Sequence, residues 1–255
     1  MNIGKLQKLI LGSAILLFSL SSITYLVRQK GYIAENVKQL IYGKKYTLDY
    51  EKNENNKFWA KKILSGGFIL FFRHAERDKW IDVQMYDALE SELQDKNPNS
   101  FRFAENEYFA DAVCLNKRGK IQAKAMGEVI KYSELPVSYV VSSPSCRARQ
   151  TANLVFGGYD ELEKKFVHKG PYTETGDRSG YLEKYILNLP RSKDKNVIIS
   201  AHNSVIGDHL FIRDKVSLEE GGFYVLSIKN NKLVLEHEFH NFNSFSKQFF
   251  IRNHD

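Results

Sequence analysis

An arginine and a histidine follow one of the apolar segments of the chain. Residues 66–72 read Gly-Gly-Phe-Ile-Leu-Phe-Phe, and Arg73 and His74 come directly after them. An apolar run of this length predicts a buried strand, and open α/β sheets bind ligands at the carboxyl ends of their strands. The pair therefore places a permanent cation beside a potential nucleophile, an arrangement that is suited to handling a phosphate.

Two further segments end in a similar way. Residues 137–141 predict a second short buried strand, which is followed by a turn and then by Arg147 at the start of a predicted helix. Residues 196–201 predict a third strand, and His202 comes next. The three strand ends thus supply two arginines and two histidines.

These segments resemble the successive signature motifs of the histidine phosphatase superfamily, in particular its phosphoglycerate mutase-like branch. The motifs are Arg73-His74-Ala75-Glu76, Ser142-Ser143-Pro144 with Arg147-Ala148 and Gln150-Thr151-Ala152, and Ser200-Ala201-His202. The run Leu115-Asn116-Lys117-Arg118-Gly119 with Gln122-Ala123 resembles the opening of the family's first long helix. The likeness extends from about residue 66 to residue 239. The third residue of the first motif is usually glycine in the family and is Ala75 here, which keeps a small side chain.

The resemblance implies a reaction through a phosphohistidine. His74 would be the nucleophile, because neutral imidazole is abundant near neutral pH without a separate activating base. Arg73 and Arg147 would hold the oxygens of the transferring phosphoryl group with planar charged forks, and His202 would add a further donor. Water would then hydrolyse the intermediate. Neither a metal nor another cofactor is expected.

The leaving alkoxide also needs a proton donor. In the mutase-like branch this is usually a glutamate between the second arginine and the second histidine, and Glu174 is the candidate in that interval. The other branch places an aspartate after the second histidine, where this chain has Asn203. Glu76 and Glu183 are the alternatives, although Glu76 could simply hold Arg77 and Glu183 has the pattern of a solvated helix face.

Other reactive side chains are expected to have structural roles. The remaining five histidines have no partners at metal-ligand spacing. Ser142 and Ser143 lack the glycine elbow of a serine nucleophile, so we expect them to cap the following helix or to brace Arg147. Cys114 and Cys146 are too few for a disulfide scaffold, and they either pair in an oxidising compartment or remain buried thiols.

The elements that would position the motifs alternate between strands and helices. Helices are predicted at 117–132, 147–156, about 180–189 and about 204–211. Residues 222–228 and 232–239 alternate around Asn230-Asn231 and predict a terminal hairpin. This order predicts an α/β fold, a three-layer sandwich with a mostly parallel sheet flanked by helices.

The amino-terminal part predicts a membrane anchor. Residues 9–27 are a run of 19 residues without a charged side chain, which is long enough to span a bilayer. We therefore expect residues 1–30 to form an uncleaved transmembrane helix. A cleaved signal peptide is the alternative, although the run continues past its small residues and no Ala-x-Ala site follows. Basic residues on both sides leave the orientation open.

Two further segments flank or interrupt the predicted catalytic domain, 63–255. Residues 31–62 are polar and predict a linker with room for one short helix. Residues 78–113 hold six aromatic side chains among many charges, without steady periodicity. A segment of this length beside a site predicts a lid or specificity element, and a packed surface excursion is the alternative.

The net charge of +7 does not indicate a nucleic-acid binder. Residues 1–50 contribute +5 of it, and the other 205 residues contribute only +2. A basic cluster beside a membrane segment fits anionic lipid headgroups or membrane topology better than a nucleic-acid footprint. We expect the membrane, and no nucleic acid, as a partner.

The leading hypothesis is a membrane-anchored phosphomonoesterase whose substrate is a phosphorylated sugar or another phosphorylated component of the cell envelope. Residues 201–203 and 233–239 resemble a periplasmic lipopolysaccharide-core heptose phosphatase of the superfamily, which favours an inner-membrane protein with its domain in the periplasm. A phosphomutase and a binding module that holds a phosphorylated ligand without turnover are the alternatives.

Overall fold

The computed structural model of the protein describes residues 52–78, 113–167, 178–203, 205 and 218–250. The chain divides into two units, Met1–Glu54 and Asn55–Asp255, and the fold below is that of the second. Several predicted features lie outside the described residues. They are the anchor at 1–30, residues 31–51 of the linker, the lid except for its first and last residues, Glu174, and the helix at about 204–211 except for Val205. Among the helices that are described, none is long and apolar enough to cross a bilayer.

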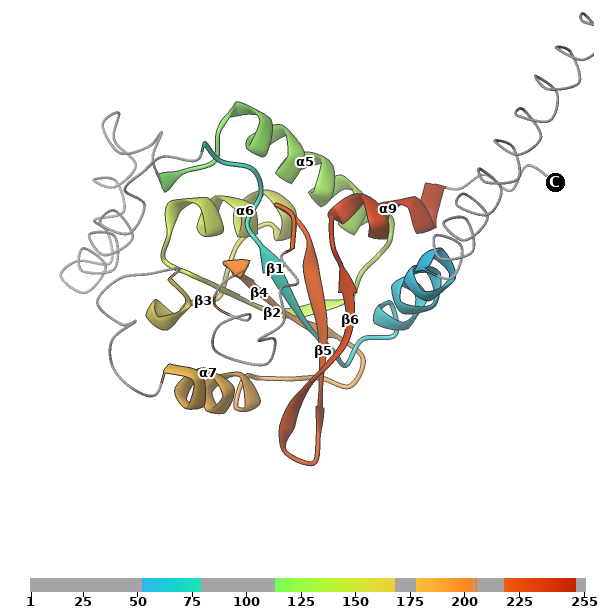
Figure 1. Ribbon diagram of the computed structural model, residues 1–255, viewed down its shortest axis with the longest axis vertical. Coiled ribbons are helices and arrows are strands. Elements are labelled where there is room, and N and C mark those ends of the chain that lie inside the picture. Colours follow the sequence, from blue (N-terminus) through green and yellow to red (C-terminus); the bar gives the residue numbers. More distant parts are fainter. Residues whose placement is uncertain (1–51, 79–112, 168–177, 204, 206–217, 251–255) are drawn as a thin grey trace, which may run out of the picture. The chain divides into compact units, whose positions relative to one another are not determined.

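A six-stranded mixed sheet forms the centre of the domain (Figure 1). Its strands are β1 (Ile69–Arg73), β2 (Val137–Ser142), β3 (Glu161–Leu162), β4 (Asn196–Ala201), β5 (Phe223–Lys229) and β6 (Lys232–Phe239), in the order β3-β2-β4-β1-β5-β6. Strands β1 to β4 run parallel, whereas β5 is antiparallel to β1 and β6 is antiparallel to β5. The predicted α/β class is confirmed. Strands β1 to β4 form the parallel part of the sheet, and the β5–β6 hairpin forms the antiparallel part.

Helices cover both faces of this sheet. On one side lie α5 (Lys117–Tyr132), α6 (Cys146–Phe156) and α9 (Phe242–Phe250), and on the other lies α7 (Arg178–Leu187) (Figure 1). Strand β1 buries apolar side chains on both faces of the sheet. Leu70 and Phe72 pack in the cluster under α5, α6 and α9. Ile69 and Phe71 pack in the cluster under α7. Alternate residues of a strand point to opposite faces, so an all-apolar strand requires a helix layer on each side.

The hairpin prediction is also confirmed. Strands β5 and β6 pair antiparallel, and Lys229 pairs with Lys232 across the turn. Asn230 and Asn231 both have positive φ, 50° and 56°. Asparagine tolerates this left-handed conformation better than most residues, which is why it suits a two-residue hairpin turn.

A helix over residues 52–63 precedes β1. Ala60 and Ile63 are buried in the same cluster as the inner face of α5. His237 of β6 holds the helix through an Nε2–Oδ1 contact of 2.8 Å with Asn56 and by stacking on Trp59.

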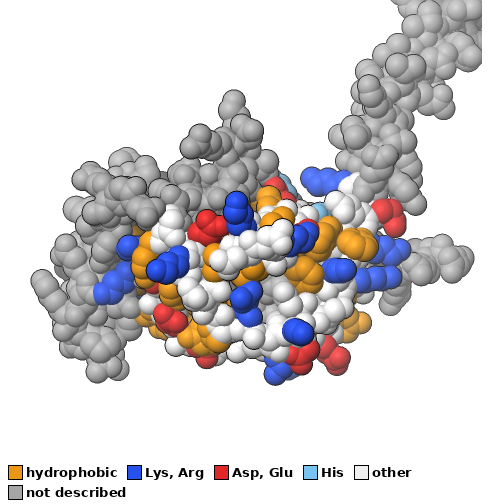
Figure 2. All heavy atoms as spheres, turned by 90° about the horizontal axis from the view of Figure 1, so that it is seen from below, with side chains coloured by type: hydrophobic (Ala, Val, Ile, Leu, Met, Phe, Trp, Pro, Cys, Tyr) orange, Lys and Arg blue, Asp and Glu red, His pale blue; other side chains and the backbone are white. Residues whose placement is uncertain are grey.

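On the face of the molecule shown in Figure 2, basic and acidic side chains are interspersed with hydrophobic ones.

Candidate active site

The candidate active site lies at the carboxyl ends of three neighbouring parallel strands. Strand β4 lies between β1 and β2, and Arg73 at the end of β1 pairs with Ala201 at the end of β4. The next residue on each strand is a histidine, and the rings of His74 and His202 lie 5.2 Å apart, edge to face. Arg147 is in the first turn of α6 and only 1% exposed. The fold therefore brings Arg73, His74, Arg147 and His202 together, as the strand-end pattern predicts.

His74 has a fixed ring orientation and a defined tautomer. Its Nδ1 lies 2.7 Å from the carbonyl oxygen of Ala75. Because a carbonyl oxygen can only accept, Nδ1 carries the proton and Nε2 carries the lone pair. The backbone of His74 is held as well, since its N–H donates to the oxygen of Ala201. The atom free to attack a phosphorus is therefore Nε2.

The surroundings keep the His74 imidazole neutral. Burial lowers its pKa well below the ordinary value of 6.5, and the charges of Arg147 and Arg73 lower the pKa further. The hydrogen bond to Ala75 opposes this shift without cancelling it. A neutral ring at physiological pH is the form that a nucleophile needs.

The segment after His74 is tied to α6. The N–H of Ala75 donates to Oγ1 of Thr151 at 2.9 Å, and Thr151 donates in turn to the carbonyl oxygen of Arg147 at 2.8 Å. Ala75 itself is fully buried. Thr151 thus fixes the segment after His74 relative to the turn of helix that carries Arg147.

The segment is also tied to the start of α5, which explains the Leu115–Gly119 motif. Asn116 caps α5, accepting the N–H of Gly119 at 2.7 Å, and donates to Oε1 of Glu76 at 3.1 Å. A Cβ at Gly119 would lie 1.8 Å from the carbonyl oxygen of Glu76, so this position requires glycine. Gln122 accepts the N–H of Glu76 at 2.8 Å. The Leu115–Gly119 motif and Gln122 therefore brace the loop that follows His74.

Glu76 is an ionised brace in this arrangement. The hydrogen bond from Asn116, and next the hydrogen bond and charge of Arg118, lower the pKa of its carboxyl below the ordinary value. An ionised carboxylate accepts hydrogen bonds and holds no proton to give. Glu76 is accordingly a poor candidate for the general acid.

Glu183 and Asn203 also have other roles. Oε1 of Glu183 lies 3.5 Å from the N–H of Leu233, which pairs with Ile228 at the turn end of the hairpin. That end of the sheet is opposite to the carboxyl end of β1, since β5 is antiparallel to β1. Asn203 accepts the N–H of Leu218 through its side-chain oxygen at 3.0 Å.

A segment that the sequence motifs did not indicate, Leu218–Gly222, holds Arg73. Nη1 of Arg73 donates to the carbonyl oxygen of Leu218, and Nη2 lies 3.2 Å from Oε1 of Glu220. The backbone is joined too, because the N–H of Arg73 donates to Gly222 at 2.9 Å. No local sequence pattern marks Glu220 as a site residue, since 147 positions separate it from Arg73.

Ser143 contacts a histidine as well as Ser145, the N-cap residue of the helix that we expected it to cap. Its Oγ lies 3.1 Å from Nε2 of His202 and accepts the N–H of Ser145 at 3.3 Å. Ser142 donates to the carbonyl oxygen of Ser143 at 2.8 Å. Both hydroxyls are fully buried. Ser143 reaches His202 because β2 and β4 are adjacent and their ends meet in space.

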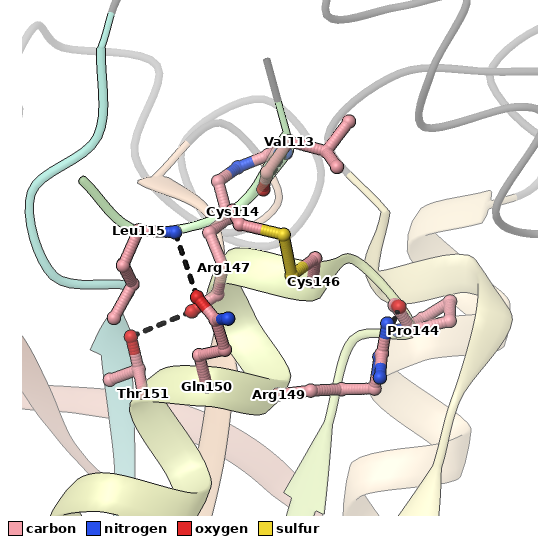
Figure 3. The surroundings of a disulfide bond; sticks show 9 residues. All are labelled: Val113, Cys114, Leu115, Pro144, Cys146, Arg147, Arg149, Gln150 and Thr151. Carbon is pink, nitrogen blue, oxygen red and sulfur yellow. Dashed lines mark hydrogen bonds between the residues drawn. A yellow bond between two sulfur atoms is a disulfide. The ribbon is translucent and has the colours of Figure 1, made fainter. Parts of the chain in front are cut away.

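Cys114 and Cys146 form a disulfide (Figure 3). It joins the segment before α5 to the first residue of α6, next to Arg147. The same two segments are joined by the N–H of Leu115, which donates to Oε1 of Gln150 at 2.9 Å. The sequence left open whether the two cysteines pair. They do pair, because α5 and α6 pack closely against each other. The disulfide thereby helps to fix Arg147.

Comparison with known proteins agrees with these observations. Residues 108–166, which contain α5, β2 and α6, match the model of the histidine phosphatase superfamily (branch 1). No curated protein sequence gives a significant match.

Several solved structures are similar to the chain. The protein histidine phosphatase SixA complexed with tungstate is 13% identical, with 68% of this chain and 96% of that chain covered and a TM-score of 0.44. Mycobacterial hydrolase 1 is 14% identical, with 68% and 97% covered and a TM-score of 0.44. A phosphoserine phosphatase from Entamoeba histolytica in complex with 3-phosphoglyceric acid is 15% identical, with 68% and 96% covered and a TM-score of 0.39.

The matched segment supplies Arg147 and its helix, and the fold joins it to the two histidines and the arginine of the remaining motifs. Over residues 108–166 the chain is thus similar to the histidine phosphatase superfamily (branch 1), and the motifs outside that segment resemble the same superfamily.

Proposed function

We propose that the protein is a phosphomonoester hydrolase that works through a phosphohistidine formed on His74. The observation that carries this proposal is the tautomer of His74, whose Nδ1 donates to Ala75 and leaves the lone pair on Nε2. A buried neutral imidazole beside two arginines is the arrangement needed to attack a phosphate ester.

The first step makes one bond and breaks one bond. Nε2 of His74 attacks phosphorus, the P–N bond forms, and the P–O bond to the leaving group breaks. Arg73 and Arg147 stabilise the negative charge on the equatorial oxygens, and His202 donates to one of them. In the second step water attacks the phosphohistidine, which releases inorganic phosphate and restores the lone pair of Nε2.

We propose Glu174 as the acid that protonates the leaving oxygen. Its support is its position between the second arginine and the second histidine, together with the roles of Glu76 and Glu183 described above. The same carboxylate would then take a proton from the attacking water.

We further propose a phosphorylated sugar or another phosphorylated envelope component as the substrate, and a periplasmic location for a domain anchored in the inner membrane. The apolar run at 9–27 supports the anchor. The Cys114–Cys146 disulfide supports an oxidising compartment, because cytosolic thiols are kept reduced. The aromatic-rich segment 78–113 would form the lid that selects the substrate.

The test uses the full-length chain in detergent and a set of phosphate esters that includes phosphorylated sugars, phosphopeptides, phosphohistidine and lipopolysaccharide fragments. We expect release of inorganic phosphate and, after a rapid quench, acid-labile phosphate on the wild-type chain. Both should be lost in a folded His74→Ala variant. Full turnover by that variant would refute the mechanism. Transfer of phosphate to a second sugar hydroxyl would indicate a mutase, and binding without release would indicate a binding module.

A further inference from the structure

Arg73 does not offer its whole guanidinium to a ligand. Nη1 donates to the carbonyl oxygen of Leu218, and Nη2 forms an ion pair of 3.2 Å with Glu220. The side chains of Arg73 and Glu220 are 20% and 17% exposed, so water screens the pair only in part. Two of the three guanidinium nitrogens therefore have a partner in the protein before any phosphate arrives.

The segment that supplies these partners is itself fixed to the end of β1. The N–H of Gly221 lies 3.2 Å from the carbonyl oxygen of Arg73 and 3.1 Å from that of His74, and the N–H of Arg73 donates to Gly222. Gly221 has a φ of +84°, a conformation that favours glycine. Nε2 of Gln122 donates to the carbonyl oxygen of Glu220 at 2.8 Å. Glu220 is thus held by the same backbone that carries the nucleophile.

The charge of Glu220 matters as much as its hydrogen bond. Burial lowers the pKa of Arg73 below its ordinary value, and Glu220 is the largest influence in the opposite direction. A carboxylate so close to a phosphate-binding arginine also repels a phosphate dianion. Glu220 therefore holds the guanidinium of Arg73 in place and at the same time lowers the affinity of the site for a phosphate anion.

We propose that Glu220 is a positioning residue that fixes the fork of Arg73, and that its negative charge limits how tightly the site binds the phosphate product. The proposal rests on the phosphatase function above, because it requires phosphate to bind at Arg73. A fixed fork speeds the chemical step, since small misplacements of a binding group are costly. A weakened grip on free phosphate favours release of the product.

Two substitutions separate the hydrogen bond from the charge. Glu220→Gln keeps an acceptor oxygen for Nη2 and removes the charge, whereas Glu220→Ala removes both. Glu236→Gln is the matched control, because Glu236 is also ion-paired, to Lys229, and its side chain is 15% exposed. Glu236 contacts Ser227 and Lys229, near the turn end of the hairpin.

The experiment measures the binding of inorganic phosphate by calorimetry and the hydrolysis of an aryl phosphate, with the full-length chain in detergent. We expect Glu220→Gln to bind phosphate roughly 3- to 30-fold more tightly, as removal of one partly screened charge implies. Glu220→Ala should lower kcat by about 10- to 100-fold. Glu220→Gln should lower kcat by less, because its amide oxygen replaces the lost acceptor. Glu236→Gln should match the wild type in both measurements.

The outcomes distinguish this proposal from the function on which it rests. Phosphate binding by the wild type with no tightening in Glu220→Gln would overturn the role of the charge, even if Glu220→Ala fails to fold. Equal kcat in Glu220→Ala and the wild type would overturn the positioning role. A wild-type chain that neither binds phosphate nor hydrolyses an ester would instead refute the phosphatase function.

Discussion

The Oγ of Ser143 lies 3.1 Å from Nε2 of His202. These residues are 59 positions apart and meet because β2 and β4 end side by side. The hydroxyl of Ser143 therefore helps to set the position of a ring that we expect to bind phosphate. The contact leads to a first prediction.

Ser143→Ala should lower kcat/KM by about 3- to 10-fold, which corresponds to the loss of one hydrogen bond of ordinary strength. Steady-state kinetics on an aryl phosphate would measure it. Ser200→Ala is the matched control, because Ser200 is also fully buried but donates to the carbonyl oxygen of Ala148. The control should lose similar stability without a similar loss in kcat/KM. Equal kinetic losses in both variants would argue against a specific role for Ser143.

His74 should make the stability of the fold depend on pH. Its pKa in the folded state lies well below 6.5, whereas in the unfolded chain it returns to about 6.5. Between these two values the unfolded state binds more protons, so the free energy of unfolding should fall as pH decreases below about 6.5. Denaturant unfolding of the wild type and of His74→Asn across this range should show a smaller pH dependence in the variant. Identical slopes would show that His74 is not buried as a neutral ring.

Arg147→Lys should lower kcat and kcat/KM by roughly 100-fold, because an ammonium group cannot reproduce the planar two-point contact with phosphate oxygens. Arg149→Lys provides the comparison on the same helix. Arg149 is also buried, and its Nε donates to the carbonyl oxygen of Pro144 at 2.8 Å. We expect the control to change stability more than catalysis. Wild-type kinetics for Arg147→Lys would place Arg147 outside the reaction.

Removal of the disulfide should reduce both stability and activity. The bond closes a loop with a sequence separation of 32, for which the loss of chain entropy in the unfolded state predicts a stabilisation of about 3 to 4 kcal/mol. Activity should fall with it because Cys146 precedes Arg147. Thermal unfolding and kinetics of a Cys114→Ser/Cys146→Ser variant would measure the two effects. A reductant should shift the wild type in the same direction and leave the double variant unchanged.

Glu174→Gln should slow the hydrolysis of alkyl phosphates strongly and that of an activated aryl phosphate little, because a good leaving group departs without a proton. The hydrolysis of both substrate classes is compared on the same preparation across pH. The limb of the wild-type pH–rate profile that reports the ionisation of Glu174 should also shift in the variant. Equal slowing on both substrate classes would make Glu174 a positioning or structural residue. An unaffected variant would require another acid.

The sequence by itself located the main strands and helices, together with the four residues that the fold brings together. Apolar runs and turn residues are local signals, so β1, β2 and β4 could be located together with the arginines and histidines that follow them. The hairpin around Asn230-Asn231 was predictable for the same reason, since backbone conformation at a two-residue turn depends on the turn residues themselves.

Only the tertiary structure decided how those residues are held. The ion pair of Arg73 with Glu220, the contact of Ser143 with His202 and the disulfide each join positions that are far apart in the chain. The hydrogen bond that fixes the tautomer of His74 joins neighbours, but it depends on a ring direction that packing sets. Such contacts follow from which strand ends and helix starts become adjacent in the packed fold, and residue types along the chain carry no local record of that adjacency.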